Sequence, residues 1–443
     1  MSSKLAILGG TPVIDKCPDK LIHWPIVNDQ MRKDVLQVLE DGNMSGSDIS
    51  RKFEDEFAKW HNRKYALAHN TGTNALIAGF YGMGIGPGDE VIAPALTYWA
   101  SCLGVIHLGG SVVFCDVDPI TLQMDPASLE ARITPRTKAI VVVHYKSYPS
   151  DMDKIMPIAK KHNLKVIEDV SHAQGGHYKG KMLGTFGDVA AMSLMSGKSF
   201  AIGEGGMLLT DDEEIFRKAV RFGHYDRIPA CYKKEEFADT FNLPVGGVKN
   251  RMHQMSAAVG LVQLTKYEAE IAEIDKAMKY FWNGVKDIPG LRMVYPSEAG
   301  SDKAGWYASH FMYDAEAFSG VSNKTFSDAV AQECDTYVIP GAALPLNKSS
   351  LFTSFDIFGE GRATATRFLP PDVDLAKLTG ELPVTATIND KVINDIWFKH
   401  CDTPILDKFI EAFHKVAEHH KDLLAINDTT PLIGQVAFTR RKN

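Results

Sequence analysis

Cysteine is scarce in this chain and is never arranged in pairs. The sequence has six cysteines in 443 residues, without a CxxC pair and without histidines at metal-ligand spacing. This pattern argues against a disulfide framework and against a structural zinc site, and it is typical of reduced thiols in a cytoplasmic protein. No metal site is therefore expected.

Long hydrophobic runs and an excess of positive charge are also absent. The most apolar segment, AIVVVH at 139–144, is far shorter than the roughly 20 residues that cross a bilayer. The apolar stretch near the start is too short for a secretory signal and is broken by Gly9 and Gly10. A net charge of −7 gives no support for binding to nucleic acid or to an anionic membrane. The sequence predicts a cytoplasmic protein without either partner.

Several common catalytic and nucleotide-binding motifs are missing as well. The chain contains no P-loop, HExxH or GxSxG motif. The glycine-rich GIGPGDE at 84–90 follows a helical stretch and precedes a strand, so it predicts a turn rather than a dinucleotide fingerprint. Composition is ordinary for a globular protein, and the length predicts two lobes.

The arrangement of periodic segments predicts an α/β fold. From about residue 50 to 210, short β-branched runs alternate with helical stretches, the spacing of a mostly parallel sheet. A long amphipathic helix after about residue 260 and a mixed region indicate a smaller α/β lobe. We predict a large domain with the N-terminal segment at 1–265. The linking helix and a small C-terminal α/β domain follow at 266–443.

Two residues indicate the chemistry. VIEDVSHA sets Asp169 at the end of a buried strand, the edge where such sheets bind ligands. Lys198 stands in SLMSGKSFAIGEGG among small residues, with no acid until Glu204. A desolvated lysine without a salt-bridge partner has a lowered pKa, which forming a Schiff base requires. With Asp169 for a protonated ring nitrogen, the pair predicts a pyridoxal phosphate (PLP) site, and we expect His144 at the same edge.

Other polar and aromatic residues could complete this site. NTGTNAL places Gly72 and Thr73 at the start of an apolar helix, whose free N–H groups could bind a phosphate or simply reflect a helix cap. Ser193 could add a hydroxyl to the same phosphate. Tyr98 could stack on the cofactor ring or pack a loop against the core. His172 could hydrogen-bond the ring oxygen or be an ordinary polar loop residue.

The chain resembles the DegT/DnrJ/StrS sugar aminotransferases, PLP enzymes of the aspartate aminotransferase fold (fold type I). The resemblance runs from the opening LGGTP through at least residue 260, in the motifs NTGTNAL, GDEVIAPALTYWAS, VIEDVSHAQGG, SGKSFAIGEGGMLLTDD and KNRMHQMSAAVGL. Two departures concern the loop near Ser147, where relatives usually carry a glycine, and the poorly matched region 225–248. The second region is expected to border the acceptor pocket.

The resemblance implies a role for each candidate residue. Lys198 carries the Schiff base (the internal aldimine) and Asp169 pairs with the pyridine nitrogen. Lys249 reaches the phosphate from the neighbouring subunit, which implies a homodimer with shared active sites. The implied cofactor-binding set is Gly72, Thr73, Tyr98, Asp169, His172, Ser193, Lys198 and Lys249.

The implied activity is amino transfer from glutamate or glutamine to a nucleotide-linked keto sugar or a cyclitol ketone, in amino sugar or cyclitol biosynthesis. The Gly197–Lys198 pair and WFKHCDTPIL favour the cyclitol and aminobenzoate-forming subgroup. One alternative is a PLP-dependent lyase or dehydratase, although the related dehydratase replaces this lysine by histidine. Another is a desulfurase using Cys102, and a third is a non-catalytic regulatory dimer.

Overall fold

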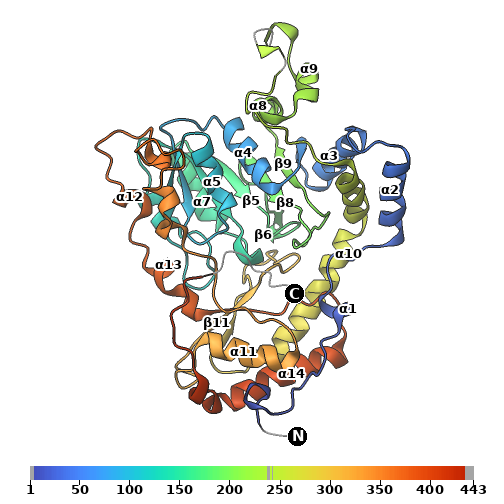
Figure 1. The fold of residues 1–443 in the computed structure, drawn as a ribbon, viewed down its shortest axis with the longest axis vertical. Coiled ribbons are helices and arrows are strands. Elements are labelled where there is room, and N and C mark those ends of the chain that lie inside the picture. Colours follow the sequence, from blue (N-terminus) through green and yellow to red (C-terminus); the bar gives the residue numbers. More distant parts are fainter. Residues whose placement is uncertain (1–3, 237–239, 242, 435–443) are drawn as a thin grey trace.

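The computed structural model describes residues 4–236, 240–241 and 243–434, and its centre is a seven-stranded sheet (Figure 1). The strands stand in the order β1-β9-β8-β5-β4-β2-β3. Of these seven strands only β9 runs opposite to the rest, because it pairs antiparallel with both of its neighbours. The mostly parallel α/β sheet predicted from the sequence is confirmed. The strands are β1 Tyr65–His69, β2 Glu90–Pro94, β3 Ser111–Cys115, β4 Thr137–Val143, β5 Lys165–Asp169, β8 Val189–Ser193 and β9 Gly206–Thr210.

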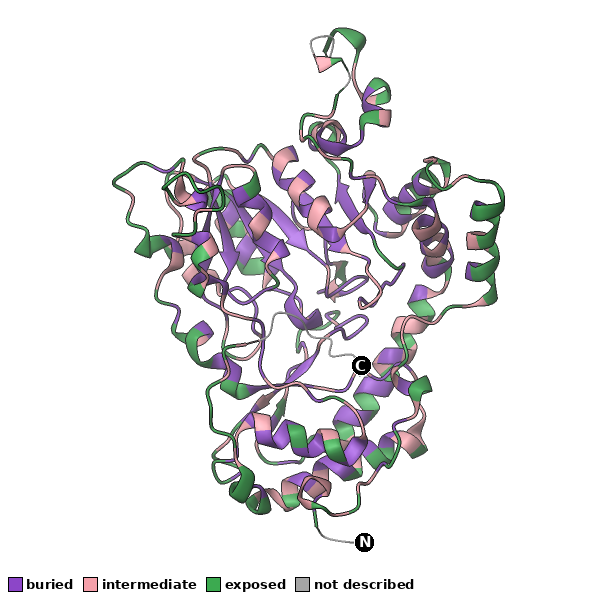
Figure 2. Cartoon of the chain, in the orientation of Figure 1, coloured by how far each residue is buried: buried purple, intermediate pink, exposed green. Residues whose placement is uncertain are grey.

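Both faces of this sheet are buried, as Figure 2 shows. Within β4, Ile140 and Val142 belong to one hydrophobic cluster, and Val141 and Val143 belong to the other, because successive side chains of a strand point to opposite faces. Helices α4, α5 and α8 cover the face of Val141, and α3, α7 and the start of α10 cover the face of Ile140. These helices are α3 Asp48–Trp60, α4 Gly72–Gly82, α5 Ala100–His107, α7 Met152–Lys161, α8 Glu213–Gly223 and α10 Gln254–Val285.

A second, smaller sheet lies below the first in Figure 1. Its three antiparallel strands, in the order β10-β11-β12, pack with α11 and α14 into a third hydrophobic cluster. The 32-residue helix α10 joins the two parts, since its first half packs on the large sheet and its second half belongs to the third cluster. The new elements are β10 Leu291–Met293, β11 His310–Tyr313, β12 Val392–Asn394, α11 Asn323–Cys334 and α14 Thr403–Glu418.

The start of the chain also packs on the smaller sheet. Leu5, Ile14 and Leu21 are buried in the third cluster. The division at residue 265 stays a prediction. No helix in the described ranges is both long and apolar enough to cross a membrane. The remaining helices and strands are α1 Asp19–Ile22, α2 Asp29–Glu40, α6 Pro126–Ala131, β6 His177–Tyr178, β7 Lys181–Met182, α9 Ile228–Cys231, α12 Ala376–Thr379 and α13 Pro383–Thr387.

Candidate active site

A cavity of about 240 Å³ lies at the carboxyl ends of β5 and β8. Seven of the eight residues of the implied cofactor-binding set line it, together with residues that the sequence did not single out. We refer to it as the active-site cavity. The seven are Gly72, Thr73, Tyr98, Asp169, His172, Ser193 and Lys198.

Asp169 is the last residue of β5 and is buried beside the cavity. Its Oδ2 accepts a hydrogen bond from the Ser101 hydroxyl at 2.7 Å, and its Oδ1 accepts one from the backbone N–H of Ser171 at 3.0 Å. The Ser101 oxygen also lies 2.9 Å from the Thr97 hydroxyl. These donors fix the orientation of the carboxylate, so it is held ready for a cationic group in the cavity.

Lys198 is buried, and it forms no ion pair with any carboxylate of the described residues. Burial lowers the pKa of its ammonium from 10.5 to about 8, while the charge of Asp169 acts in the opposite direction. Its Nζ lies 4.4 Å from the centroid of the Tyr307 ring, the distance of a cation–π contact. A substantial fraction of this amine is therefore neutral, and so nucleophilic, near physiological pH.

The hydrogen-bonding pattern fixes the tautomer of His172. Its Nδ1 accepts a hydrogen bond from the backbone N–H of Lys146 at 3.2 Å, and burial holds the pKa of the ring well below its usual value. The neutral ring therefore carries its proton on Nε2. The ring centroid lies 4.7 Å from that of Tyr307. His172 thus brings a hydrogen-bond donor to the cavity.

A strained turn supports His172. Lys146 and Ser147 are both buried and both adopt left-handed backbone conformations, with φ of 55° and 60°. The Ser147 hydroxyl lies 2.5 Å from the carbonyl oxygen of His172 and 2.9 Å from that of Tyr307, and it can donate to one at a time. Glycine would adopt the left-handed conformation of Ser147 without this strain.

The opposite end of the cavity is formed by the start of α4. The Thr71 hydroxyl caps this helix by accepting from the N–H of Asn74 at 3.1 Å, so the expected helix cap is present at the edge of the cavity. Gly72 lies so close to Ser193 that a Cβ on it would approach the Ser193 Cα to 2.6 Å. A Cβ on Gly206 would come within 2.4 Å of the Thr71 carbonyl oxygen. Gly206 therefore allows the backbone of β9 to pack closely against Thr71, just before α4.

The residues of the cavity fit PLP. A buried amine with a lowered pKa and an oriented carboxylate face one cavity, and the N-terminus of α4 with the Ser193 hydroxyl offers donors for a phosphate. Tyr98 lines the same cavity and is 39% exposed, so its ring is available for stacking. Within the described part of the chain, no group of three or more histidine, cysteine or acidic side chains is placed to hold a metal ion.

Two residues named from the sequence do not line the cavity. His144 follows β4 at the predicted sheet edge, where its backbone N–H donates to the Asp169 carbonyl oxygen at 3.2 Å, but its side chain is engaged elsewhere: Nε2 lies 3.0 Å from Glu168 Oε2, and Nδ1 accepts from the N–H of Ser150. Lys249 is exposed and lies outside the lining, with its Nζ 5.9 Å from the centroid of the Tyr225 ring. Its expected contact is with the neighbouring subunit.

Sequence reasoning missed Ser101 and Tyr307. Ser101 lies in the first turn of α5, three residues after Tyr98, and this nearness to a candidate stacking residue was the one signal in the sequence. Tyr307 precedes β11 and reaches the cavity only through the packing of the smaller sheet on the larger one. No motif near it signals that position.

Comparison with known proteins agrees with this geometry. The sequence model of the DegT/DnrJ/EryC1/StrS aminotransferase family matches residues 25–339. The spore coat polysaccharide biosynthesis protein SpsC of Bacillus subtilis is 32% identical over 378 residues, 84% of this chain and 94% of that protein. The L-glutamine:2-deoxy-scyllo-inosose aminotransferase of Streptoalloteichus tenebrarius is 30% identical over 452 residues, 96% of this chain and all of that protein. The crystal structure of 3-amino-5-hydroxybenzoic acid synthase covers 93% of this chain and all of its own, with a TM-score of 0.72 and 26% identity.

Proposed function

Because the chain belongs to the DegT/DnrJ/EryC1/StrS aminotransferase family, we propose that it uses PLP to move an amino group from glutamate or glutamine to a polyhydroxylated ketone. The ketone is a nucleotide-linked keto sugar or a cyclitol ketone. The observation that carries the proposal is the buried amine of Lys198, with its lowered pKa, in one cavity with Asp169.

Each part of the cofactor has a matching group in the cavity. Lys198 would hold its aldehyde carbon, Asp169 its ring nitrogen and His172 Nε2 its phenolic oxygen. Gly72, Thr73 and Ser193 would hold the phosphate, and Tyr98 would stack on the ring. When bound, PLP supplies a carbonyl carbon for the amine and a ring that accepts the electron pair released at the substrate carbon.

Lys198 is the group that moves the proton. Its pKa of about 8 lies near the working pH, so Nζ can take a proton from the donor's α-carbon and return it elsewhere in the same turnover. Asp169 keeps its orientation throughout, because Ser101 and the N–H of Ser171 hold its two oxygens. The Tyr307 ring, beside Nζ, limits the access of water to the amine.

The names of the relatives favour a ketone related to sugars as the acceptor. One similar protein acts, by its name, on 2-deoxy-scyllo-inosose with L-glutamine, and another serves polysaccharide biosynthesis. We propose a cyclitol ketone first and a nucleotide-linked keto sugar second. The first is favoured by the coverage of 96% of this chain in the match to the cyclitol enzyme.

We also propose a homodimer with shared active sites. No residue between 205 and 306 lines the active-site cavity in the described part of one chain. Lys249 is exposed within this stretch, so it is available to a partner subunit. Its proposed role is to contact the phosphate in the partner's cavity.

The alternative functions have less support. A desulfurase needs a reactive thiol on a mobile loop, but Cys102 is buried inside α5 and burial raises the pKa of its thiol. The related dehydratase lacks the lysine that this chain has at 198. A non-catalytic regulatory dimer would not need a desolvated lysine beside an oriented carboxylate.

The proposed function is tested by measuring its two half-reactions separately. The purified protein with PLP is mixed with L-glutamate or L-glutamine, and the absorbance of the lysine-bound cofactor is followed as it converts to the aminated form. Inososes and nucleotide-linked keto sugars are then added, and amine products are sought by mass spectrometry. Conversion followed by a new amine supports the proposal. Sulfide or dehydrated sugar without an amine product overturns it.

A further inference from the structure

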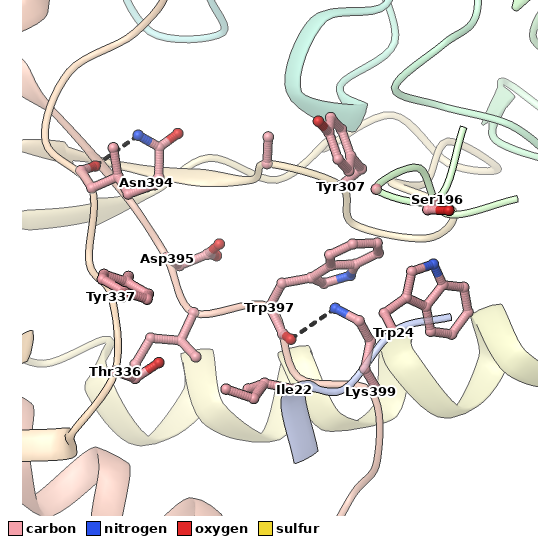
Figure 3. A pocket seen from close by; sticks show the side chains of 14 residues that line it. Ile22, Trp24, Ser196, Tyr307, Thr336, Tyr337, Asn394, Asp395, Trp397 and Lys399 are labelled. Atoms are coloured by element: carbon pink, nitrogen blue, oxygen red, sulfur yellow. Dashed lines mark hydrogen bonds between the residues drawn. The ribbon is translucent and has the colours of Figure 1, made fainter. Parts of the chain in front are cut away.

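A second cavity, of about 350 Å³, lies across Tyr307 from the active site (Figure 3). We refer to it as the indole cavity, because the indole rings of Trp24 and Trp397 form part of its wall. Tyr307 lines both cavities, and Ser196 and Gly197, which precede Lys198, line this one. Its size falls in the range of small-molecule sites, about 300–1,000 Å³. The two cavities therefore adjoin at Tyr307 and at the loop of Lys198.

The walls of the indole cavity are held in place by hydrogen bonds. Trp24 Nε1 donates to the carbonyl oxygen of Lys198 at 2.7 Å, and Trp397 Nε1 donates to that of Gly305 at 2.8 Å. The two indole rings lie 5.7 Å apart between centroids. Because both rings are fixed by the fold, the cavity exists before any ligand enters, which lowers the entropy cost of binding. The bond from Trp24 also connects the wall of the indole cavity to the backbone of Lys198.

Lys399 gives the cavity a buried amine, and burial holds the pKa of its ammonium well below the usual 10.5. Its side chain is only 3% exposed, and Figure 3 shows its nitrogen between the two indoles. Its Nζ donates to the Trp397 carbonyl oxygen at 2.9 Å, and this is the one hydrogen bond that the described residues provide for its three donors. A buried ammonium is costly unless an anion pairs with it.

The one carboxylate that lines the indole cavity is already engaged. The Ser309 hydroxyl lies 2.7 Å and 2.6 Å from the two oxygens of Asp395 and donates to one at a time, and Oδ2 also accepts from Trp282 Nε1 at 2.8 Å. Asp395 and Lys399 form no ion pair within the described part of the chain. Lys399 thus has no carboxylate partner among the described residues, and a ligand carboxylate beside it would raise its pKa and favour the ammonium form.

We propose that the indole cavity binds a carboxylate of the amino donor, with Lys399 as its cation. The inference rests on the proposed function, since the donor must react beside Lys198. One ammonium matches one carboxylate. A nucleotide diphosphate carries more negative charge than one ammonium can balance. The aliphatic and aromatic lining suits the methylene groups that separate the two ends of glutamate or glutamine.

Direct binding tests the assignment without turnover. Glutarate, a dicarboxylate without an amine, is titrated by calorimetry into the PLP-loaded enzyme and into Lys399→Met, Lys399→Arg and Lys303→Met. Lys303 is the matched control, because it is also buried but donates to the Val294 carbonyl oxygen at 3.1 Å and does not line the indole cavity. We expect Lys399→Met to weaken glutarate binding about 10-fold or more, with Arg restoring most of it and Lys303→Met unchanged. The neutral glutaramide should bind all four equally.

The first half-reaction gives a second readout. In Lys399→Met, the donor concentration for half-maximal cofactor conversion should rise about 10-fold, while the dependence on the ketone stays unchanged. Equal glutarate binding in wild type and Lys399→Met would overturn the proposal, as would an effect confined to the ketone. Failure of the proposed function is distinct: wild-type enzyme would then convert no cofactor with any donor, whatever glutarate binding shows.

Discussion

Lys198 and Lys399 are two buried lysines on opposite sides of Tyr307, and their surroundings differ. Burial lowers the pKa of both ammonium groups. Lys198 faces a cavity that also presents the oriented carboxylate of Asp169, whereas Lys399 stands between indoles and bonds a backbone carbonyl. Burial alone therefore does not make a lysine catalytic. The groups that share its cavity decide whether it serves as a nucleophile or as the partner of an anionic ligand.

The largest effect should come from removing the amine of Lys198. Lys198→Ala loses both the covalent attachment point and the proton carrier, so we expect amino transfer to fall by about 10⁴-fold or more. The absorbance of the lysine-bound cofactor should vanish, and borohydride should no longer fix the cofactor to the chain. Steady-state assays and mass spectrometry of the reduced protein measure these changes. Turnover near the wild-type rate would contradict the catalytic role of Lys198, because this lysine would then differ little from Lys399.

The carboxylate that distinguishes the two lysines can be altered without changing its shape. Asp169→Asn keeps the hydrogen-bonding geometry but removes the charge, and we expect kcat to fall about 100-fold. Ser101→Ala leaves the charge but removes the 2.7 Å bond to Oδ2, so its effect should be smaller, about 10-fold. Cofactor titration by absorbance separates lost binding from lost turnover. A Ser101→Ala effect as large as that of Asp169→Asn would show that orientation, and not charge, is the important property.

Both lysines should destabilise the cofactor-free protein. With a pKa of about 8 when folded against 10.5, Lys198 binds fewer protons in the folded chain between these values, so stability rises with pH across that window. Below pH 8 the lysine is protonated in both states, and its burial then lowers the stability by the largest amount. Lys198→Met should therefore raise the free energy of unfolding at pH 7 by up to about 3 kcal/mol. Lys399→Met should change it in the same direction.

Denaturant titrations at pH 7 and pH 10.5 check this pair of variants. The advantage of each methionine over its lysine should shrink at the higher pH. A constant difference between wild type and variant at both values would mean that packing, and not the cost of the buried charge, sets the stability of these sites.

The active site was largely predictable because its residues lie at strand ends and in short motifs. Asp169 and Lys198 are 29 positions apart and meet because β5 and β8 are neighbours in the sheet. Tyr307 and Lys399 could not be predicted, because they reach the Lys198 loop only when the smaller sheet packs on the larger one. His144 lies at the predicted sheet edge but does not line the cavity, because a position after a strand does not fix the side-chain direction. Its ring turns towards Glu168, away from the cavity.

The smallest effect concerns the turn that positions His172 and Tyr307, the two rings beside Lys198. Ser147 has a φ of 60°, and its hydroxyl lies within hydrogen-bonding distance of the carbonyl oxygens of both residues. Ser147→Ala keeps the strain and loses the hydroxyl, whereas Ser147→Gly loses the hydroxyl and relieves the strain. Thermal unfolding should therefore show the glycine variant to be more stable than the alanine variant by about 1 kcal/mol. If alanine were the more stable, left-handed strain at Ser147 would not set the stability of this turn.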